Sequence, residues 1–137
     1  MSMNTGTDGS RGRADSGQRA VDIEELGRML GSRDPKMLAA VLRIWMDKFP
    51  EQLQALFRAA AARDRSAMRQ NAHSAKGGAQ QAAVFRLGEL IASLEAASDE
   101  EQWQHIDALL DRMKEEEKQA RQFITEYLHM VGQPLKK

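Results

Sequence analysis

One histidine in this 137-residue chain has neighbours suited to nucleophilic chemistry. His73 is followed by Lys76 three residues on and by Gly77 four residues on. In a helix these positions share one face, so an imidazole, a cation and a gap without a side chain would lie together. Gly78 follows, and two glycines inside a helix cost about 1 kcal/mol each relative to alanine. Close approach of a second protein's backbone to the ring would offset that cost, although tight helix packing is an alternative explanation.

The residues around His73 predict an exposed face at the edge of a core. Apolar residues, four of them alanine, recur along the expected helix and form its buried stripe: Met68, Ala72, Ala75, Ala79 and Ala82. His73 lies one position beyond this stripe, about 100° around the helix. On the same side the chain places only polar residues and glycine: Arg69, Lys76, Gly77 and Gln80. We therefore expect a partner-binding surface here that includes Arg69, Gly78 and Gln80.

A carboxylate on the next helix is expected to hold the ring. If two helices form a hairpin with its turn near residue 84, positions 73 and 95 lie level across it. Glu95 follows Leu94 and flanks the apolar stripe of its helix, as His73 flanks its own. A hydrogen bond from Nδ1–H of His73 to this carboxylate would fix the tautomer and leave Nε2 unprotonated.

Other chemistry finds little support in the residue types. The chain has no cysteine, which excludes disulfides, thiolate metal sites and a thiol nucleophile. His105 and His129 lack comparable neighbours, and we interpret them as structural or solvated. Since a zinc site needs several converging ligands, we expect no metal and no cofactor to be bound by this chain.

The elements that must position these residues are predicted to be helices. Hydrophobic residues make up 42% of the chain and aromatic residues only 5%, with few β-branched residues, which favours helix over sheet. Residues 1–20 show no apolar period and are interpreted as a disordered tail. Asp22 can cap a short helix that ends at Gly31, and Ser32 or Asp34 can cap a second with Pro35 in its first turn.

The apolar period predicts three further stretches of helix. The second helix continues in phase through Pro50, so a kink is expected there and not a break. A third helix should begin near Asp64 or Ser66, turn around residues 82–84 and be followed by a fourth that ends near residue 97. Ser98 or Asp99 should cap a last long helix, which ends before a short tail at residues 132–137. We predict an all-α fold over residues 21–131: an antiparallel up-down-up-down four-helix bundle with an extra short N-terminal helix.

Charge and hydropathy exclude several classes of function. Net charge is zero, but residues 58–86 hold six basic residues and one acidic, while residues 99–117 hold eight acidic and two basic. The basic segment contains His73 and is either a solvated face or a docking face for an acidic partner. Nucleic-acid binding is disfavoured because net charge is zero and aromatic residues are not interleaved with the basic ones. No apolar run is long enough to span a membrane and no secretory signal is visible, so a cytoplasmic location is expected. A monomer is the default expectation.

The run from Ala72 to Gly77, followed by Leu87, Leu90, Leu94 and Glu95, resembles the histidine phosphotransfer (HPt) domains of bacterial phosphorelays. The resemblance covers residues 22–128. It implies that His73 matches the phosphorylated histidine, Lys76 the lysine beside the phosphoryl group, Gly77 the glycine that gives access, and Glu95 the residue that holds the imidazole. The family often has leucine at position 75 and glycine at position 83, where this chain has alanine.

The resemblance also implies partners. The chain would receive a phosphoryl group from an aspartyl phosphate on a receiver domain and pass it to another, between a hybrid histidine kinase and a response regulator. Magnesium is expected on the receiver domain. Because no segment resembles a nucleotide-binding loop, we expect no autonomous kinase activity, and whether such a carrier counts as an enzyme is a matter of convention. The alternative is a non-catalytic adaptor that binds a receiver or kinase domain.

Overall fold

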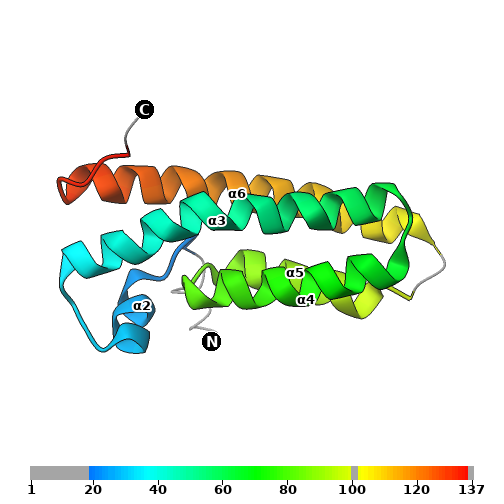
Figure 1. Ribbon diagram of the computed structural model, residues 1–137, viewed down its shortest axis with the longest axis horizontal. Helices are drawn as coiled ribbons and strands as arrows, with labels where there is room; N and C mark the ends of the chain where they lie inside the picture. Colours follow the sequence, from blue (N-terminus) through cyan, green and yellow to red (C-terminus); the bar gives the residue numbers. More distant parts are fainter. Residues whose placement is uncertain (1–18, 100–101, 136–137) are drawn as a thin grey trace, which may run out of the picture.

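The computed structural model describes residues 19–99 and 102–135, and every regular element in these ranges is a helix. There are five: α2 (Ile23–Leu30), α3 (Pro35–Ala61), α4 (Arg65–Gln81), α5 (Phe85–Ala97) and α6 (Trp103–Met130). The four longer helices run antiparallel in chain order, and α6 returns to pack beside α3 (Figure 1). The predicted up-down-up-down four-helix bundle is confirmed. The short α2 lies beyond the end of the α4–α5 hairpin, beneath the start of α3.

Side chains that cap helix N-termini mark the starts of three of the five described helices. The carboxylates of Asp22, Asp34 and Asp64 accept hydrogen bonds from backbone N–H groups in the first turns of α2, α3 and α4. Each bond satisfies a donor that the helix itself leaves unpaired, which is why aspartate is favoured at this position. These three starts agree with the sequence prediction, as does Pro35 at the first position of α3.

The predicted start of the last helix is wrong. Helix α6 begins at Trp103 after Gln102, and no side chain caps it. Ser98, which we expected to cap this helix, instead ends α5, and its hydroxyl donates to the carbonyl of Glu95. The hydroxyl is therefore used by the preceding helix, and the chain needs several more residues before α6 begins.

Pro50 lies inside α3, which continues through it as a single helix. Proline lacks the N–H that would bond to the carbonyl of Met46, so one hydrogen bond of the ladder is missing. The ribbon of α3 changes direction part-way along (Figure 1). The apolar stripe nevertheless stays on the core side at Met46, Phe49 and Leu53, all buried. A kinked single helix, as predicted, keeps the hydrophobic face continuous.

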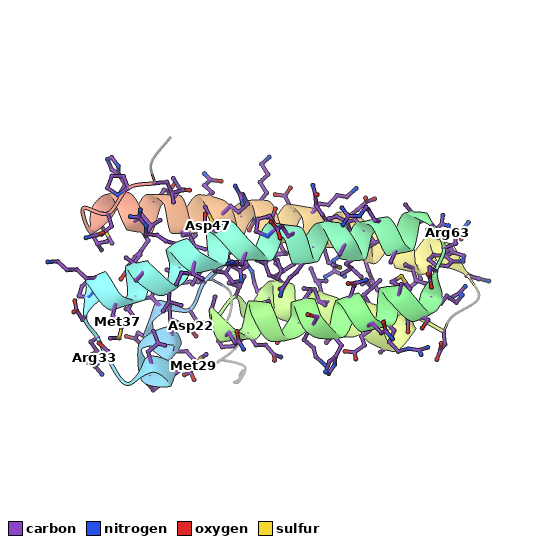
Figure 2. All side chains as sticks on the ribbon, in the orientation of Figure 1. Asp22, Met29, Arg33, Met37, Asp47 and Arg63 are labelled. Carbon is purple, nitrogen blue, oxygen red and sulfur yellow. The ribbon has the colours of Figure 1, made fainter. Side chains whose placement is uncertain are left out.

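The core lies between two pairs of helices, α3 with α6 and α4 with α5, and Figure 2 shows side chains filling the space between them. Helix α4 contributes Met68, Ala72, Ala75 and Ala79, which are fully buried. A methyl group added to Gly88 of α5 would lie 3.7 Å from the Cβ of Ala79. The small residues therefore let α4 and α5 approach closely, which brings the side chains at the edges of their stripes within reach of each other.

The turn between α4 and α5 occupies residues 82–84, as predicted. The N–H of Val84 bonds to the carbonyl of Ala79 and that of Ala83 to Gln80, the pattern of a Schellman motif. This motif requires a left-handed residue, and Ala83 has a φ of 60°. Position 83 is also where the family that this sequence resembles often has glycine. The alanine found here therefore adopts a conformation that is easier for glycine.

The ends of the predicted domain are only partly described. Of the expected tail at residues 1–20, residues 1–18 lie outside the described residues, while Ala20 is buried in the core. Of the expected tail at 132–137, Leu135 packs against the core and residues 136–137 are not described. Over the described ranges, no helix combines the length and hydropathy that crossing a membrane requires.

Candidate functional site

His73 lies near the middle of α4 with its side chain 73% exposed. Its neighbour in the chain, Ala72, is fully buried. The rotation of about 100° per residue turns His73 away from the core. The position at the edge of the apolar stripe is the one that the sequence predicts.

Glu95 of α5 holds one side of the ring. Its Oε2 lies 3.1 Å from Nδ1 of His73. With a carboxylate as the partner, Nδ1 carries the proton and donates, and the neutral ring then has an unprotonated Nε2. The two residues are level because the hairpin turns at residues 82–84, midway between them in the chain. The predicted contact between His73 and Glu95 is present in the structure.

Lys76 contacts the same carboxylate, which the sequence reasoning did not anticipate. Its Nζ donates to Oε1 of Glu95 at 2.9 Å, so the two oxygens of Glu95 are shared between the ring and the ammonium. The Lys76 ammonium holds the pKa of the Glu95 carboxyl below its usual range, burial opposes this, and His73 lowers the pKa further. The register of the hairpin could have predicted this contact. Residue 76 lies opposite residue 92, which is one turn from Glu95, and a lysine side chain is long enough to reach that distance.

The two glycines have different surroundings. A Cβ at Gly77 would meet nothing within 4 Å, so this position is an open gap beside His73. A Cβ at Gly78 would lie 2.5 Å from Oε1 of Gln52 and 3.4 Å from the ring of Phe49, both on α3. Gly77 thus fits the prediction of access to the ring, whereas Gly78 lets α3 and α4 pack closely, the alternative that the sequence left open.

Gly78 also borders a groove between α3 and α4. The groove has a volume of about 230 Å³ and is lined by Val41, Ile44, Trp45, Lys48, Phe49, Gln52, Gly78, Gln81 and Ala82. Ile44 is 60% exposed at its edge. Gly78 is five residues from His73, which corresponds to about 7 Å along the helix. The sequence reasoning missed this groove because its residues come from two helices and only their packing brings them together.

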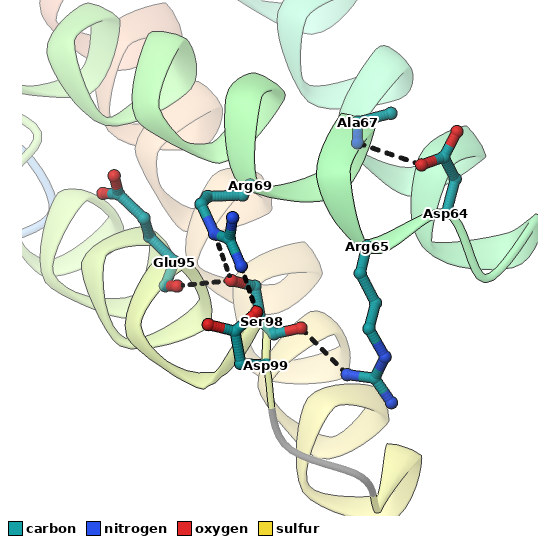
Figure 3. A network of polar contacts seen from close by, with 7 residues as sticks. All are labelled: Asp64, Arg65, Ala67, Arg69, Glu95, Ser98 and Asp99. Carbon is teal, nitrogen blue, oxygen red and sulfur yellow. Dashed lines mark hydrogen bonds and ion pairs between the residues drawn. The ribbon is translucent and has the colours of Figure 1, made fainter.

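The remaining residues of the predicted partner surface lie on either side of His73 along α4. Gln80 is exposed. Arg69 is not free, because its Nε donates to the hydroxyl of Ser98 at 3.0 Å and its guanidinium pairs with Asp99 (Figure 3). Ser98 is a residue of this region that the sequence reasoning assigned to a helix cap only. Over residues 19–99 and 102–135, no group of three or more potential metal ligands converges.

Comparison with known families agrees with this geometry. The family model described as "Hpt domain" matches residues 40–123, which is more than half of the chain and contains His73, Lys76, Gly77 and Glu95. The chain belongs to the Hpt domain family. Hpt domains carry a phosphoryl group on a histidine in phosphorelays and interact there with receiver domains and kinases. This chain is therefore a phosphorelay histidine carrier with the helical bundle of its family. No curated protein and no solved structure matches it.

Proposed function

We propose that His73 is the phosphoacceptor of this Hpt domain, and that it takes the phosphoryl group from an aspartyl phosphate on one receiver domain and gives it to another. The observation that supports this most directly is the hydrogen bond between Nδ1 of His73 and Glu95 on a ring that is otherwise exposed. This bond orients the ring and directs the Nε2 lone pair outward, where a second protein can reach it.

The transfer is an in-line displacement at phosphorus. The Nε2 lone pair forms the N–P bond while the bond from phosphorus to the aspartyl oxygen breaks, and the aspartate leaves as a carboxylate. The phosphorylated ring keeps the proton on Nδ1 and becomes a cation, which Glu95 stabilises through the same hydrogen bond. Magnesium bound by the receiver would supply most of the electrostatic catalysis. Reversal of these steps passes the group to the second receiver.

Lys76 supplies positive charge beside the reacting atoms. In the unphosphorylated protein its ammonium is paired with Glu95. The phosphoryl group carries about two negative charges, so the ammonium gains a second anionic partner when the group arrives. We infer that Lys76 stabilises the phosphorylated state while remaining close to the carboxylate that orients His73.

The receiver would dock over the open position at Gly77. The absence of a side chain there leaves space for a partner backbone beside the ring. Gln80 is exposed further along the same face, and the groove bordered by Gly78 and Ile44 offers apolar surface on the α3 side. Interfaces combine apolar and polar contacts, so the proposed surface offers both kinds of contact to a receiver.

Transfer from a labelled receiver domain tests the assignment. Incubating this protein with a receiver that carries a radioactive aspartyl phosphate should give an acid-labile label on the Hpt domain. His73→Gln should carry no label while keeping the helical circular-dichroism spectrum, because an exposed substitution changes stability by about 0.5 kcal/mol or less. The exposed His105 and His129 provide matched controls, and replacing either with glutamine should leave labelling intact.

The adaptor alternative predicts a different outcome of the same experiment. An adaptor would bind the receiver without accepting the label, and His73→Gln would then bind as the parent protein does. Label that persists in His73→Gln would show that another residue is the acceptor. Either result would overturn the assignment of His73.

A further inference from the structure

Ser98 is the one buried polar residue in the part of the chain that the structure describes, with 1% of its surface exposed. Its hydroxyl donates to the carbonyl of Glu95 at 2.8 Å and accepts a hydrogen bond from Nε of Arg69 at 3.0 Å. Its own carbonyl accepts from the guanidinium of Arg65 at 2.8 Å. A buried hydroxyl whose donor and acceptor are both satisfied is held in one geometry. The bonds of Ser98 therefore hold the end of α5 in a fixed position against α4.

The bonds of Ser98 act on Glu95, the residue that orients His73. Glu95 is bound at both ends: its carbonyl is held by Ser98, and its carboxylate holds His73 and Lys76. Figure 3 shows the carbonyl of Glu95 directed toward Ser98 and its carboxylate on the other side. Arg69 lies four residues before His73 on α4, so its contact with Ser98 and the contact of His73 with Glu95 are one helical turn apart. A displacement of the last turn of α5 would therefore move the Glu95 carboxylate relative to the ring.

We propose that Arg69 is a positioning residue for the phosphoacceptor. Through Ser98 it fixes the final turn of α5, so that the Glu95 carboxylate stays on Nδ1 of His73 and Nε2 stays unprotonated. Arg69 then contributes to transfer without touching the phosphoryl group. The effect of Arg69 on transfer rests on the proposed function of His73, whereas the effect of Arg69 on the ring does not depend on that function.

Nitrogen NMR of the unphosphorylated protein tests the effect on the ring. In the parent protein the neutral form of the His73 ring should carry its proton mainly on Nδ1, where Glu95 can accept its hydrogen bond. Arg69→Gln should shift the population toward the Nε2–H tautomer that free histidine prefers, because the last turn of α5 loses the bond from Arg69 to Ser98 and the Glu95 carboxylate keeps only its bond to Lys76 as a second support. Arg69→Lys keeps one donor for the Ser98 hydroxyl and should retain most of the Nδ1–H form. A change confined to helix stability would not move this ratio.

Two control variants separate the effect of the hydrogen bond between Arg69 and Ser98 from general effects of charge. Asp99→Asn removes the ion pair of Arg69 but leaves its bond to Ser98, so the tautomer ratio should stay that of the parent. Arg63→Gln removes an arginine of similar exposure that pairs with Asp107, and it should also leave the ratio unchanged. If Arg69→Gln does not fold, Ser98→Ala provides the second test, with the same expected shift.

Transfer kinetics give the second readout. Arg69→Gln should slow transfer from a phosphorylated receiver roughly tenfold, because a misplaced nucleophile loses reactivity steeply. An unchanged tautomer ratio in Arg69→Gln and Ser98→Ala would overturn the proposal. An unchanged ratio together with faster loss of the label would assign Arg69 to direct phosphoryl contact instead. A parent protein that accepts no label would refute the function of His73, and the NMR result would still decide the role of Arg69.

Discussion

Replacing Gly77 with glutamine should make the bundle more stable and the protein less active at the same time. A Cβ at this position meets nothing within 4 Å, so the first carbon of the new side chain enters open space without a clash. Alanine in a helix interior is more favourable than glycine by about 0.8–1 kcal/mol, and glutamine recovers about half of that gain. For a domain of this size, Gly77→Ala should raise the melting temperature by about 3–5 °C and Gly77→Gln by about 2 °C.

The effect on transfer should have the opposite sign. A long side chain at position 77 occupies the space where the receiver backbone would approach His73. A displacement of about 1 Å between reacting atoms can cost 100-fold in rate, and we expect a loss of that order for Gly77→Gln. Thermal denaturation followed by circular dichroism and single-turnover transfer from a labelled receiver measure the two quantities separately.

Gly78 supplies the matched control. An added Cβ there lies 2.5 Å from the end of the Gln52 side chain and 3.4 Å from the ring of Phe49. Gln52 must move, so Gly78→Ala should gain less stability than Gly77→Ala. Transfer by Gly77→Gln at the parent rate would refute the close approach to the ring. A loss of stability in Gly77→Ala would show that the space beside Gly77 is not open and would refute the predicted rise in melting temperature.

The remaining predictions concern the carboxylate and the helix packing. Lys76→Met should raise the pKa of Glu95 toward its usual value in carbon NMR titrations, because the ammonium is the main cause of the lowered pKa. A carboxyl group whose pKa is lower in the folded state stabilises the fold at pH values above its unfolded-state pKa of about 4.3. This contribution is lost as the pH falls through the folded-state pKa, so Lys76→Met should lose less stability in acid than the parent protein. Ala79→Leu should cost about 1–3 kcal/mol in urea denaturation because Gly88 lies against Ala79. A cost near zero would mean that α4 and α5 separate easily.

Local features of the sequence determined most of the helices. Asp22, Asp34 and Asp64 are placed where an N-cap side chain bonds to its own first turn, so neighbours in the chain suffice to predict the starts of α2, α3 and α4. The exposure of His73 followed in the same way from its offset of one residue from a buried stripe. Its contact with Glu95 required only one further step, the position of the hairpin turn, because antiparallel helices with a known turn have a known register.

Features that depend on how far apart two helices lie were decided by the tertiary structure. Ser98 had the residue type of a cap for the next helix, but its hydroxyl donates to the carbonyl of Glu95 in its own helix and accepts from Arg69 of α4, a contact that depends on how closely α4 and α5 pack. The difference between Gly77 and Gly78 depends on which of them faces α3. Spacing along one helix defines a face, whereas the partner of that face depends on the packing of the whole bundle. The sequence alone therefore predicted the exposed His73 and its contact with Glu95, and the packing decided how Lys76 and Arg69 are held around them.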